Sequence, residues 1–299
     1  MKQLVVFLAV IYSVSAAAQA DRFDKVEIKT TKLSQNVYLL EGEGGNIGVS
    51  TGDDGVFVID DQFAPLTARI LAAIKTISDK PVRFLINTHW HFDHAGGNEN
   101  LGKNGVVIVA QDNVRKRLAA KTPIDFFKST YGPTPAAGLP AITFKETVTF
   151  HLNGDQATAI HAPNAHTDGD SIIHFRNANV VHMGDTYFNG LYPFIDTGTG
   201  GSVKGMIAAA DRGLQLTDDT SKIIPGHGPL SNKAELKAYR DMLASVSAKV
   251  TMLVKQKKTL AQVIAAKPSS AYDGKWGNGF LKPDQFVEIV YTSIAVAKR

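Results

Sequence analysis

The stretch "NTHWHFDHAGG" (residues 87–97) holds three of the nine histidines of the chain and an aspartate within six residues. These residues are His89, His91, Asp93 and His94. Imidazole and carboxylate groups are ligands for zinc, and also for iron or manganese. A single catalytic zinc takes three protein ligands and a water molecule. Four candidate ligands in one segment therefore suggest two metal ions.

The cluster directly follows "PVRFLINT" (81–88), an apolar run that predicts a buried strand. The C-terminal ends of strands are where open α/β sheets bind ligands. His89 and His91 are two residues apart, so both side chains can point to the same side and chelate one ion. Asp93 and His94 are adjacent and are expected to diverge, which suits a second ion, or one ligand and one base.

Strand and helix signals alternate on both sides of this segment. Short β-branched or aromatic runs between Gly and Asp turns predict strands over 36–42, 46–52 and 56–61. Apolar residues at helical spacing predict a helix over 66–78, and a strand–helix pair follows over 106–120. We interpret the Pro/Gly-rich segment 131–140 as a loop between two halves of one domain.

The second half of the chain also contains both strand and helix signals. "ITF" (142–144) opens a second set of strands that extends to residue 185, followed by a helix near 203–215 and a short strand "KIIPG" (222–226). Helical stretches continue to the C-terminus. Within them, 271–295 is expected to be a packing helix of the outer layer, with a dimer contact as the alternative. This pattern predicts two sheets between helical layers.

The N-terminus has the features of a secretory signal. Lys2 precedes an apolar run over 4–14, and "AQA" (18–20) has the small-x-small form of a cleavage site. We therefore predict a signal peptide over 1–20, a single mature domain over 21–299, and a periplasmic or secreted location; a short membrane anchor is the alternative. No later stretch is long and apolar enough to cross a bilayer, so no stable membrane association is expected after cleavage.

The composition limits the possible metal ligands and the class of substrate. The chain has no cysteine, so a metal must be held by histidine and carboxylate alone. The formal charge is +4, and the one cluster of lysines, "KQKK" (255–258), is expected to be a solvated helix end. A nuclease would need a basic groove, so we expect a small-molecule substrate and no nucleic acid. The sequence leaves the oligomeric state open.

Three further Gly-rich loops follow predicted strands. "PNAHTDGD" (163–170) contains His166, "HMGDTYFNG" (182–190) contains Asp185, and "IIPGHGPL" (223–230) contains His227. Their shared position at strand ends makes them further candidate ligands. The other histidines fall within predicted strands and are expected to pack or to face solvent: His151, His161, His174 and His182. Of these, His161 and His182 lie near the ligand loops, where they could orient ligands.

The pattern H-x-H-x-D-H, followed by these three loops, resembles the metallo-β-lactamase superfamily over essentially all of residues 24–299. The resemblance implies an α+β fold, an αββα sandwich in which two mixed β-sheets pack between outer helices. It also implies two zinc ions per chain, with iron or manganese as alternative metals. In that family pattern one zinc is held by His89, His91 and His166, the other by Asp93, His94 and His227, and Asp185 bridges them.

The resemblance implies hydrolysis of an amide or ester bond. Two zinc ions would lower the pKa of a shared water towards ~7 and yield a hydroxide that attacks a carbonyl carbon. Asp93 is the candidate catalytic residue, which would orient this hydroxide and later pass on its proton. Tyr187 is a candidate to stabilise the oxyanion, although a packing role is the favoured interpretation.

The substrate is less well determined, because proteins with this fold catalyse many different reactions. The signal peptide and motifs resemble secreted β-lactamases, so β-lactam hydrolysis is expected as a main or promiscuous activity. However, the best-known secreted subclass has Cys in place of Asp185, Arg in place of His94, and a drug-binding Lys in place of Phe188. "GDTYFNG" (184–190) instead resembles the Asp-bridged lactonases and glyoxalase II-like thioesterases, and both remain alternatives.

Two alternatives come from other classes of protein. An iron-dependent redox enzyme could use the same ligand set. A non-catalytic binding protein is disfavoured, because no ligand position is lost.

Overall fold

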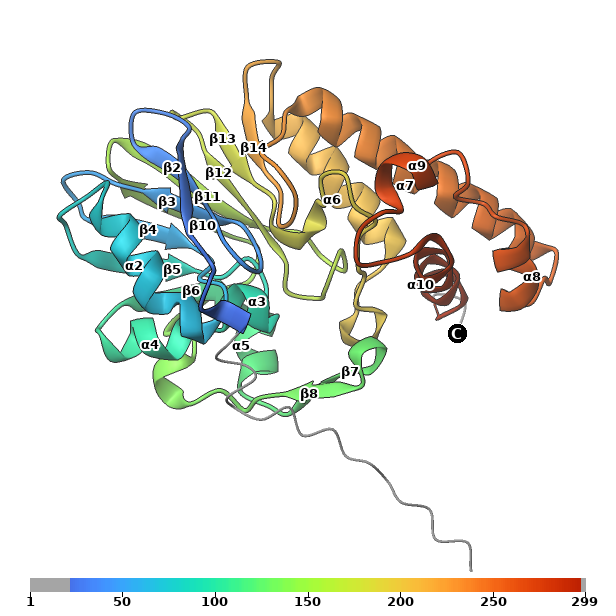
Figure 1. Cartoon of the computed structure of the whole chain (residues 1–299), viewed down its shortest axis with the longest axis horizontal. Coiled ribbons are helices and arrows are strands. Elements are labelled where there is room, and N and C mark those ends of the chain that lie inside the picture. The colour runs from blue at the N-terminus through green and yellow to red at the C-terminus, as the bar shows by residue number, and fades with distance from the viewer. Residues whose placement is uncertain (1–21, 297–299) are drawn as a thin grey trace, which may run out of the picture.

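Two β-sheets lie face to face at the centre of the molecule, with helices on their outer faces (Figure 1). The computed structural model describes residues 22–296, so the expected signal peptide over 1–20 lies outside the described residues. None of the helices within 22–296 is long and apolar enough to cross a membrane.

The first sheet has seven strands in the order β1-β2-β3-β4-β5-β6-β9. Its first four strands pair antiparallel, and β4, β5, β6 and β9 pair parallel. The strands are β1 (Lys29–Lys32), β2 (Val37–Glu41), β3 (Ile47–Ser50), β4 (Val56–Ile59), β5 (Val82–Ile86), β6 (Val107–Gln111) and β9 (Ile142–Phe144). The assignment of "ITF" to the second set of strands was wrong, because β9 pairs with β6 at the edge of the first sheet.

The second sheet has five strands in the order β10-β11-β12-β13-β14. They are β10 (Thr147–Leu152), β11 (Asp155–His161), β12 (Ser171–Phe175), β13 (Val180–His182) and β14 (Lys222–Ile224). Only the last pair, β13 with β14, is parallel. A separate antiparallel hairpin, β7 (Thr122–Ile124) with β8 (Ser129–Tyr131), was not expected from the sequence.

Helices cover the outer face of each sheet, and further helices pack mainly against other helices. They are α2 (Thr67–Lys75), α3 (Phe92–Ala95), α4 (Asn98–Lys103), α5 (Asp112–Leu118), α6 (Val203–Leu216), α7 (Lys233–Lys255), α8 (Leu260–Ala265), α9 (Asp273–Trp276) and α10 (Pro283–Val296). Short 3-10 turns are η1 (Ala64–Leu66), η2 (Asp125–Phe127), η3 (Ala136–Gly138), η4 (Gly184–Thr186) and η5 (Thr197–Thr199). Helices α6 and α7 begin at side-chain caps, Ser202 and Asn232, which accept hydrogen bonds from first-turn N–H groups.

The buried side chains form three cores, one for each interface of a four-layer sandwich. Strand residues alternate between them because successive side chains point to opposite faces of a sheet. On β12, Ile172 packs towards α6 and α7, whereas Ile173 packs between the two sheets. On β4, Phe57 belongs to the core between the sheets and Val58 to the core beneath α2. The predicted αββα arrangement is confirmed.

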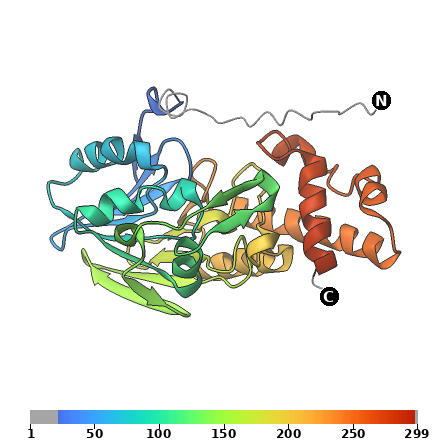
Figure 2. The ribbon, with the colours of Figure 1, turned by 90° about the horizontal axis from the view of Figure 1, so that it is seen from below.

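The C-terminal helices gather at one end of the sandwich (Figure 2). The segment 271–295 is helical as expected, in α9 and α10, but α10 packs mainly against α7 and α8 and not against a sheet. Its Phe286 and Val290 are fully buried in the core that also contains α6 and α7.

Candidate metal centre

The seven predicted ligand residues come from four chain segments that follow strands. His89 and His91 lie in the loop after β5, and Asp93 and His94 lie on α3 directly beyond it. The other three follow strands of the second sheet: His166 after β11, Asp185 in η4 after β13, and His227 after β14. Strands from both sheets thus deliver their C-terminal ends to one edge of the sandwich.

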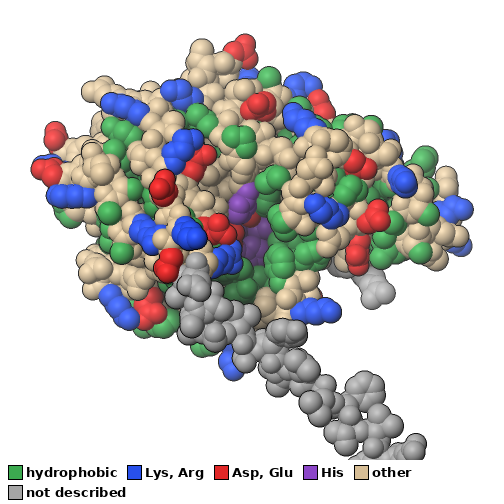
Figure 3. All heavy atoms as spheres, in the orientation of Figure 1, with side chains coloured by type: hydrophobic (Ala, Val, Ile, Leu, Met, Phe, Trp, Pro, Cys, Tyr) green, Lys and Arg blue, Asp and Glu red, His purple; other side chains and the backbone are tan. Residues whose placement is uncertain are grey.

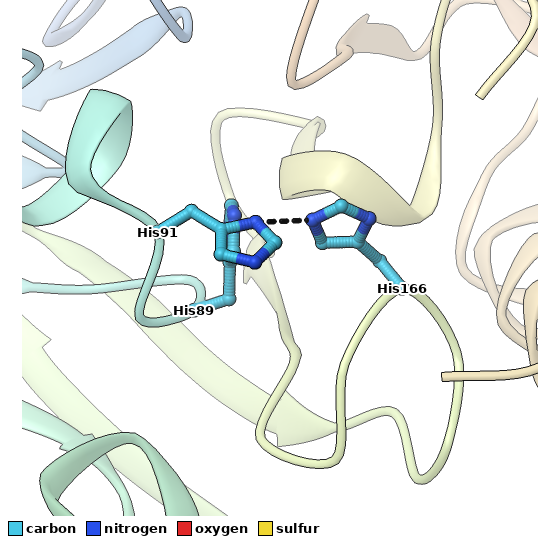
Figure 4. Close-up of side chains that lie close together, drawn as sticks. All are labelled: His89, His91 and His166. Carbon is cyan, nitrogen blue, oxygen red and sulfur yellow. Dashed lines mark hydrogen bonds between the residues drawn. The ribbon is translucent and has the colours of Figure 1, made fainter. Parts of the chain in front are cut away.

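The first cluster consists of His89, His91 and His166 (Figure 4). His91 Nδ1 lies 2.8 Å from His166 Nε2. The ring of His89 stands edge-on to both, with centroids 4.9 Å from His91 and 4.7 Å from His166. One ring nitrogen from each residue lies within 4.8 Å of the others, so the three can ligate one ion.

The second cluster consists of Asp93, His94 and His227. His227 Nε2 lies 3.3 Å from Asp93 Oδ2 and 3.2 Å from His94 Nε2. The expectation that Asp93 and His94 diverge was wrong, since Asp93 Oδ2 is 3.8 Å from His94 Nε2. Although their Cα–Cβ directions differ on α3, both side chains are long enough to reach the same point.

Asp185 lies between the two clusters. Its Oδ2 is 3.5 Å from His166 Nε2 and 3.9 Å from His89 Nε2. Its Oδ1 is 3.0 Å from His94 Nε2 and 3.4 Å from His227 Nε2. Each oxygen of this buried carboxylate therefore faces one cluster.

The residues fit divalent metal ions. His91 Nδ1 and His166 Nε2 face each other. Two ring nitrogens can form a hydrogen bond only when one of them carries a proton, whereas two unprotonated nitrogens can bind the same metal ion. His89 Nε2 and Asp185 Oδ1 are buried and make no hydrogen bond, despite the 3.0 Å approach of Asp185 Oδ1 to His94. Buried polar atoms usually have partners. A set of convergent nitrogen and oxygen donors without sulfur suits zinc, iron or manganese.

In four of the ligand histidines, the ring nitrogen that points away from the clusters contacts another residue. His94 Nδ1 is 2.8 Å from Asp60 Oδ2, and His91 Nε2 is 3.1 Å from Asp196 Oδ2. The remaining two pairs are His166 Nδ1 with the Phe194 carbonyl oxygen and His89 Nδ1 with Thr88 Oγ1. Such partners select the tautomer that leaves the inner nitrogen free for a metal.

Sequence reasoning missed Asp60 and Asp196. Asp60 had a usable signal, because it directly follows the strand "VFVI" just as the ligands follow theirs. Asp196 had none, because it lies in an irregular segment before η5 and far from His91 in sequence. Thr88 connects the two sides of the site: its N–H and hydroxyl donate to Asp60, 2.7 Å in each case.

We expect Asp60→Asn to lower affinity for the metal at the second cluster by roughly 10–100-fold. The asparagine side chain lacks the negative charge that attracts the Nδ1–H of His94. The backbone should not be disturbed, because asparagine tolerates the positive φ of this position (63°). Competition with a chromogenic chelator would measure the affinity. Unchanged affinity would show that Asp60 has only a packing role.

Burial and neighbouring charges shift the pKa values of the site. Burial, reinforced by His94, holds the pKa of His89 well below its usual value. Burial also dominates at His166, whose pKa falls to about 4, so the His89 and His166 imidazoles are neutral, as ligands require. Burial alone would raise the pKa of Asp93, but His94 and His227 lower it to about 2, so this carboxylate is ionised at neutral pH.

Two glycines let the backbone approach the ligands. A Cβ on Gly45 would overlap the ring of His94, and a Cβ on Gly226 would overlap Asp185 Oδ1. Neither glycine needs a positive φ, so the requirement is one of space alone.

We therefore expect Gly226→Ala to displace the Asp185 carboxylate and to reduce bound metal to about one ion per chain or fewer. The matched control is Gly274→Ala, because a Cβ at Gly274 meets nothing within 4 Å. Elemental analysis of both variants measures the effect. Equal metal content in the two variants would contradict it.

The other sequence candidates lie outside the clusters. Tyr187 is fully buried, and its hydroxyl bonds Ser231 Oγ at 2.7 Å, which matches the packing interpretation and not the oxyanion role. His182 Nε2 bonds the Asn46 carbonyl oxygen and its Nδ1 accepts from the Gly184 N–H, next to Asp185. His161 Nε2 contacts the carbonyl oxygen of Asp168, in the His166 loop.

A family model described as the metallo-beta-lactamase superfamily matches residues 30–227, which include all seven candidate ligands. The chain belongs to this superfamily. Its members are metal-dependent hydrolases, and this superfamily member carries a histidine and aspartate cluster suited to a divalent metal.

The curated relatives are named for several activities. The acyl-coenzyme A thioesterase MBLAC2 of Gallus gallus is 23% identical, over 64% of this chain and 72% of its own length. A probable hydroxyacylglutathione hydrolase of Schizosaccharomyces pombe is 28% identical, over 64% and 67%. A metallo-beta-lactamase type 2 of Bacteroides fragilis is 23% identical, over 76% and 90%. The chain spans 40% of a further relative, the 2,4-dinitroanisole O-demethylase subunit alpha of a Nocardioides species.

Solved structures share the fold. A metallo-beta-lactamase from Pontibacter korlensis superposes with a TM-score of 0.60 at 21% identity, covering 73% of this chain and 99% of that one. A sec-alkylsulfatase from a Pseudomonas species gives 0.70 at 15% identity, covering 92% of this chain and 51% of that one.

Proposed function

We propose that this superfamily member is an exported dinuclear zinc hydrolase that cleaves an amide or ester bond. The observation that carries the proposal is the position of Asp185, whose two carboxylate oxygens each face one histidine-containing cluster. A carboxylate in this position can bridge two cations. The proposed ligands are His89, His91 and His166 for one zinc, Asp93, His94 and His227 for the other, and Asp185 for both.

Bound zinc would supply Lewis acidity, polarising the scissile carbonyl group and lowering the pKa of water. Asp93 is the proposed catalytic residue, because it lines a pocket that opens above the two clusters and its Oδ2 lies beside His227 and His94. An ionised Oδ2 accepts a hydrogen bond from water and so orients its oxygen towards the carbonyl carbon. Asp93 takes a proton from this water as the water oxygen bonds to the acyl carbon, and passes the proton to the leaving atom as the bond between that atom and the acyl carbon breaks.

β-Lactam hydrolysis is proposed as a main or promiscuous activity, supported by the β-lactamase among the relatives. Phe188 favours the promiscuous activity over the main one. Its buried ring stacks on that of His227, with centroids 5.2 Å apart, so this position has no cation to bind a drug carboxylate. Thioester hydrolysis is the second candidate, supported by the thioesterase and hydroxyacylglutathione hydrolases among the relatives. Lactone hydrolysis uses the same chemistry.

A hydrolysis panel on the zinc-loaded protein tests these proposals. It compares a chromogenic cephalosporin, an acyl-homoserine lactone and a glutathione thioester, and we expect turnover of at least one. Elemental analysis of natively purified protein belongs with it, since iron with little zinc would favour the redox alternative. Zinc-loaded protein inert towards every carbonyl substrate would favour a binding role.

A further inference from the structure

The pocket above the two clusters has a polar floor and aromatic walls. It encloses about 240 Å³, and Asp93, Asp185 and His227 form its floor together with His91. Figure 3 shows histidine at the bottom of this hollow, beside hydrophobic side chains. The aromatic members of the wall are Phe63, Phe92, Phe127, Phe188, Phe194 and Phe280.

The wall offers little to a negatively charged substrate. Among the lining residues that the structure describes, Arg22 is the one arginine or lysine. Its guanidinium already pairs with Glu43 at 2.6 Å and lies 5.0 Å from the centroid of the Phe63 ring. An anionic group that reached this guanidinium would therefore share it with Glu43.

Two of the wall residues are unusually exposed for their type. Phe127 belongs to the turn of the β7–β8 hairpin and is 44% exposed; Phe280 lies between α9 and α10 and is 52% exposed. Phe127 contacts the buried Phe194, with ring centroids 5.0 Å apart. Phe280 lies beyond the residues that the family model matches, so the C-terminal segment adds a wall of its own to the pocket.

We propose that this pocket binds an uncharged, apolar acyl or aryl group of the substrate, next to the bond that is cleaved, and that Phe127 and Phe280 determine this preference. Apolar walls with a few convergent polar groups are typical of small-molecule sites. Exposed aromatic side chains at such a mouth lose their unfavourable contact with water when an apolar ligand covers them. The proposal rests on the hydrolase function proposed above and defines its substrate class as neutral apolar esters and lactones.

The test uses p-nitrophenyl acetate, butyrate and hexanoate with the zinc-loaded protein. We expect kcat/KM to rise about fourfold for each methylene that the pocket buries. Burial of at least two of the four added methylenes would raise it roughly tenfold or more from acetate to hexanoate. Phe127→Ala and Phe280→Ala should each reduce the hexanoate-to-acetate ratio by about threefold or more. The matched control is Met252→Ala, because Met252 on α7 is 54% exposed and does not line the pocket.

A second substrate pair tests charge at equal length. The p-nitrophenyl monoester of adipate carries a carboxylate where the hexanoate ester ends in a methyl group, and we expect it to be hydrolysed more slowly. Faster hydrolysis of the adipate ester would overturn the proposal and would assign anion binding to Arg22.

Calorimetric binding of 2-octanone, a neutral ketone that cannot be hydrolysed, separates this proposal from the hydrolase function. We expect the affinity for 2-octanone to fall about threefold or more in Phe280→Ala and to stay unchanged in Met252→Ala. Pocket-dependent ketone binding without turnover of any ester, lactone, thioester or cephalosporin would refute the hydrolase function and support the pocket. Ester turnover with the same chain-length ratio in wild type and both phenylalanine variants would refute the pocket proposal and leave the hydrolase intact.

Discussion

Asp185→Ala is expected to lower kcat/KM by about 10³-fold or more and to leave about one metal ion per chain at most. The carboxylate faces both clusters, with Oδ2 3.5 Å from His166 Nε2 and Oδ1 3.0 Å from His94 Nε2. Removing it takes a ligand from both proposed ions at once. Metal-ion catalysis contributes several kcal/mol of transition-state stabilisation, and each 1.36 kcal/mol is tenfold in rate.

The measurements are elemental analysis and ester hydrolysis on protein purified without added chelator. Asp211→Ala is the matched control, because Asp211 pairs with Arg240 on the surface of the molecule. Two retained ions together with undiminished turnover would remove Asp185 from the bridging position. Two retained ions with lost turnover would assign it a catalytic role without a bridging one.

His166→Ala and His227→Ala are each expected to reduce bound zinc from about two ions per chain to one, and to lower kcat/KM by about 10²-fold or more. His166 belongs to the cluster with His89 and His91, and His227 to the cluster with Asp93 and His94. A ligand at 1,000 times its dissociation constant stabilises a fold by about 4 kcal/mol. Zinc should therefore raise the melting temperature of the wild type more than that of either variant.

His151→Ala is the control for this pair, because His151 lies exposed on β10 and outside every cluster in the described residues. Calorimetric melting with and without zinc, together with elemental analysis, measures both effects. A wild type that binds one ion, or a His227→Ala variant that keeps two, would refute the dinuclear arrangement.

Much of the centre was predictable because its residues obey a local rule. A strand of the central sheets must end at the edge of the sandwich, so a polar residue in the loop behind an apolar run is placed there by chain geometry alone. His89 and His91 behind β5, and His227 behind β14, follow this rule. Asp60 follows it too, but a single aspartate behind a strand is a weaker signal than a loop with several histidines.

Contacts between distant segments were not predictable in this way. "ITF" has the same local pattern whether it pairs with β6 or with β10, and only hydrogen bonding to β6 places it in the first sheet. Asp196 and His91 are separated by 105 residues, and no periodicity connects them. The convergence of Asp93 and His94 depends on side-chain torsions that sequence spacing does not specify.

The sequence by itself determined the layer order and the set of candidate ligands, because alternation of apolar residues and strand-end position are local properties. The resemblance to the superfamily already implied which ligands share a cluster and that Asp185 lies between them. The tertiary structure alone decided that Asp60 and Asp196 contact His94 and His91, and that Phe127 and Phe280 line the same pocket. Those contacts depend on how the two sheets, the hairpin and the C-terminal helices pack together. Packing of segments far apart in the chain is a property of the whole fold and not of any stretch within it.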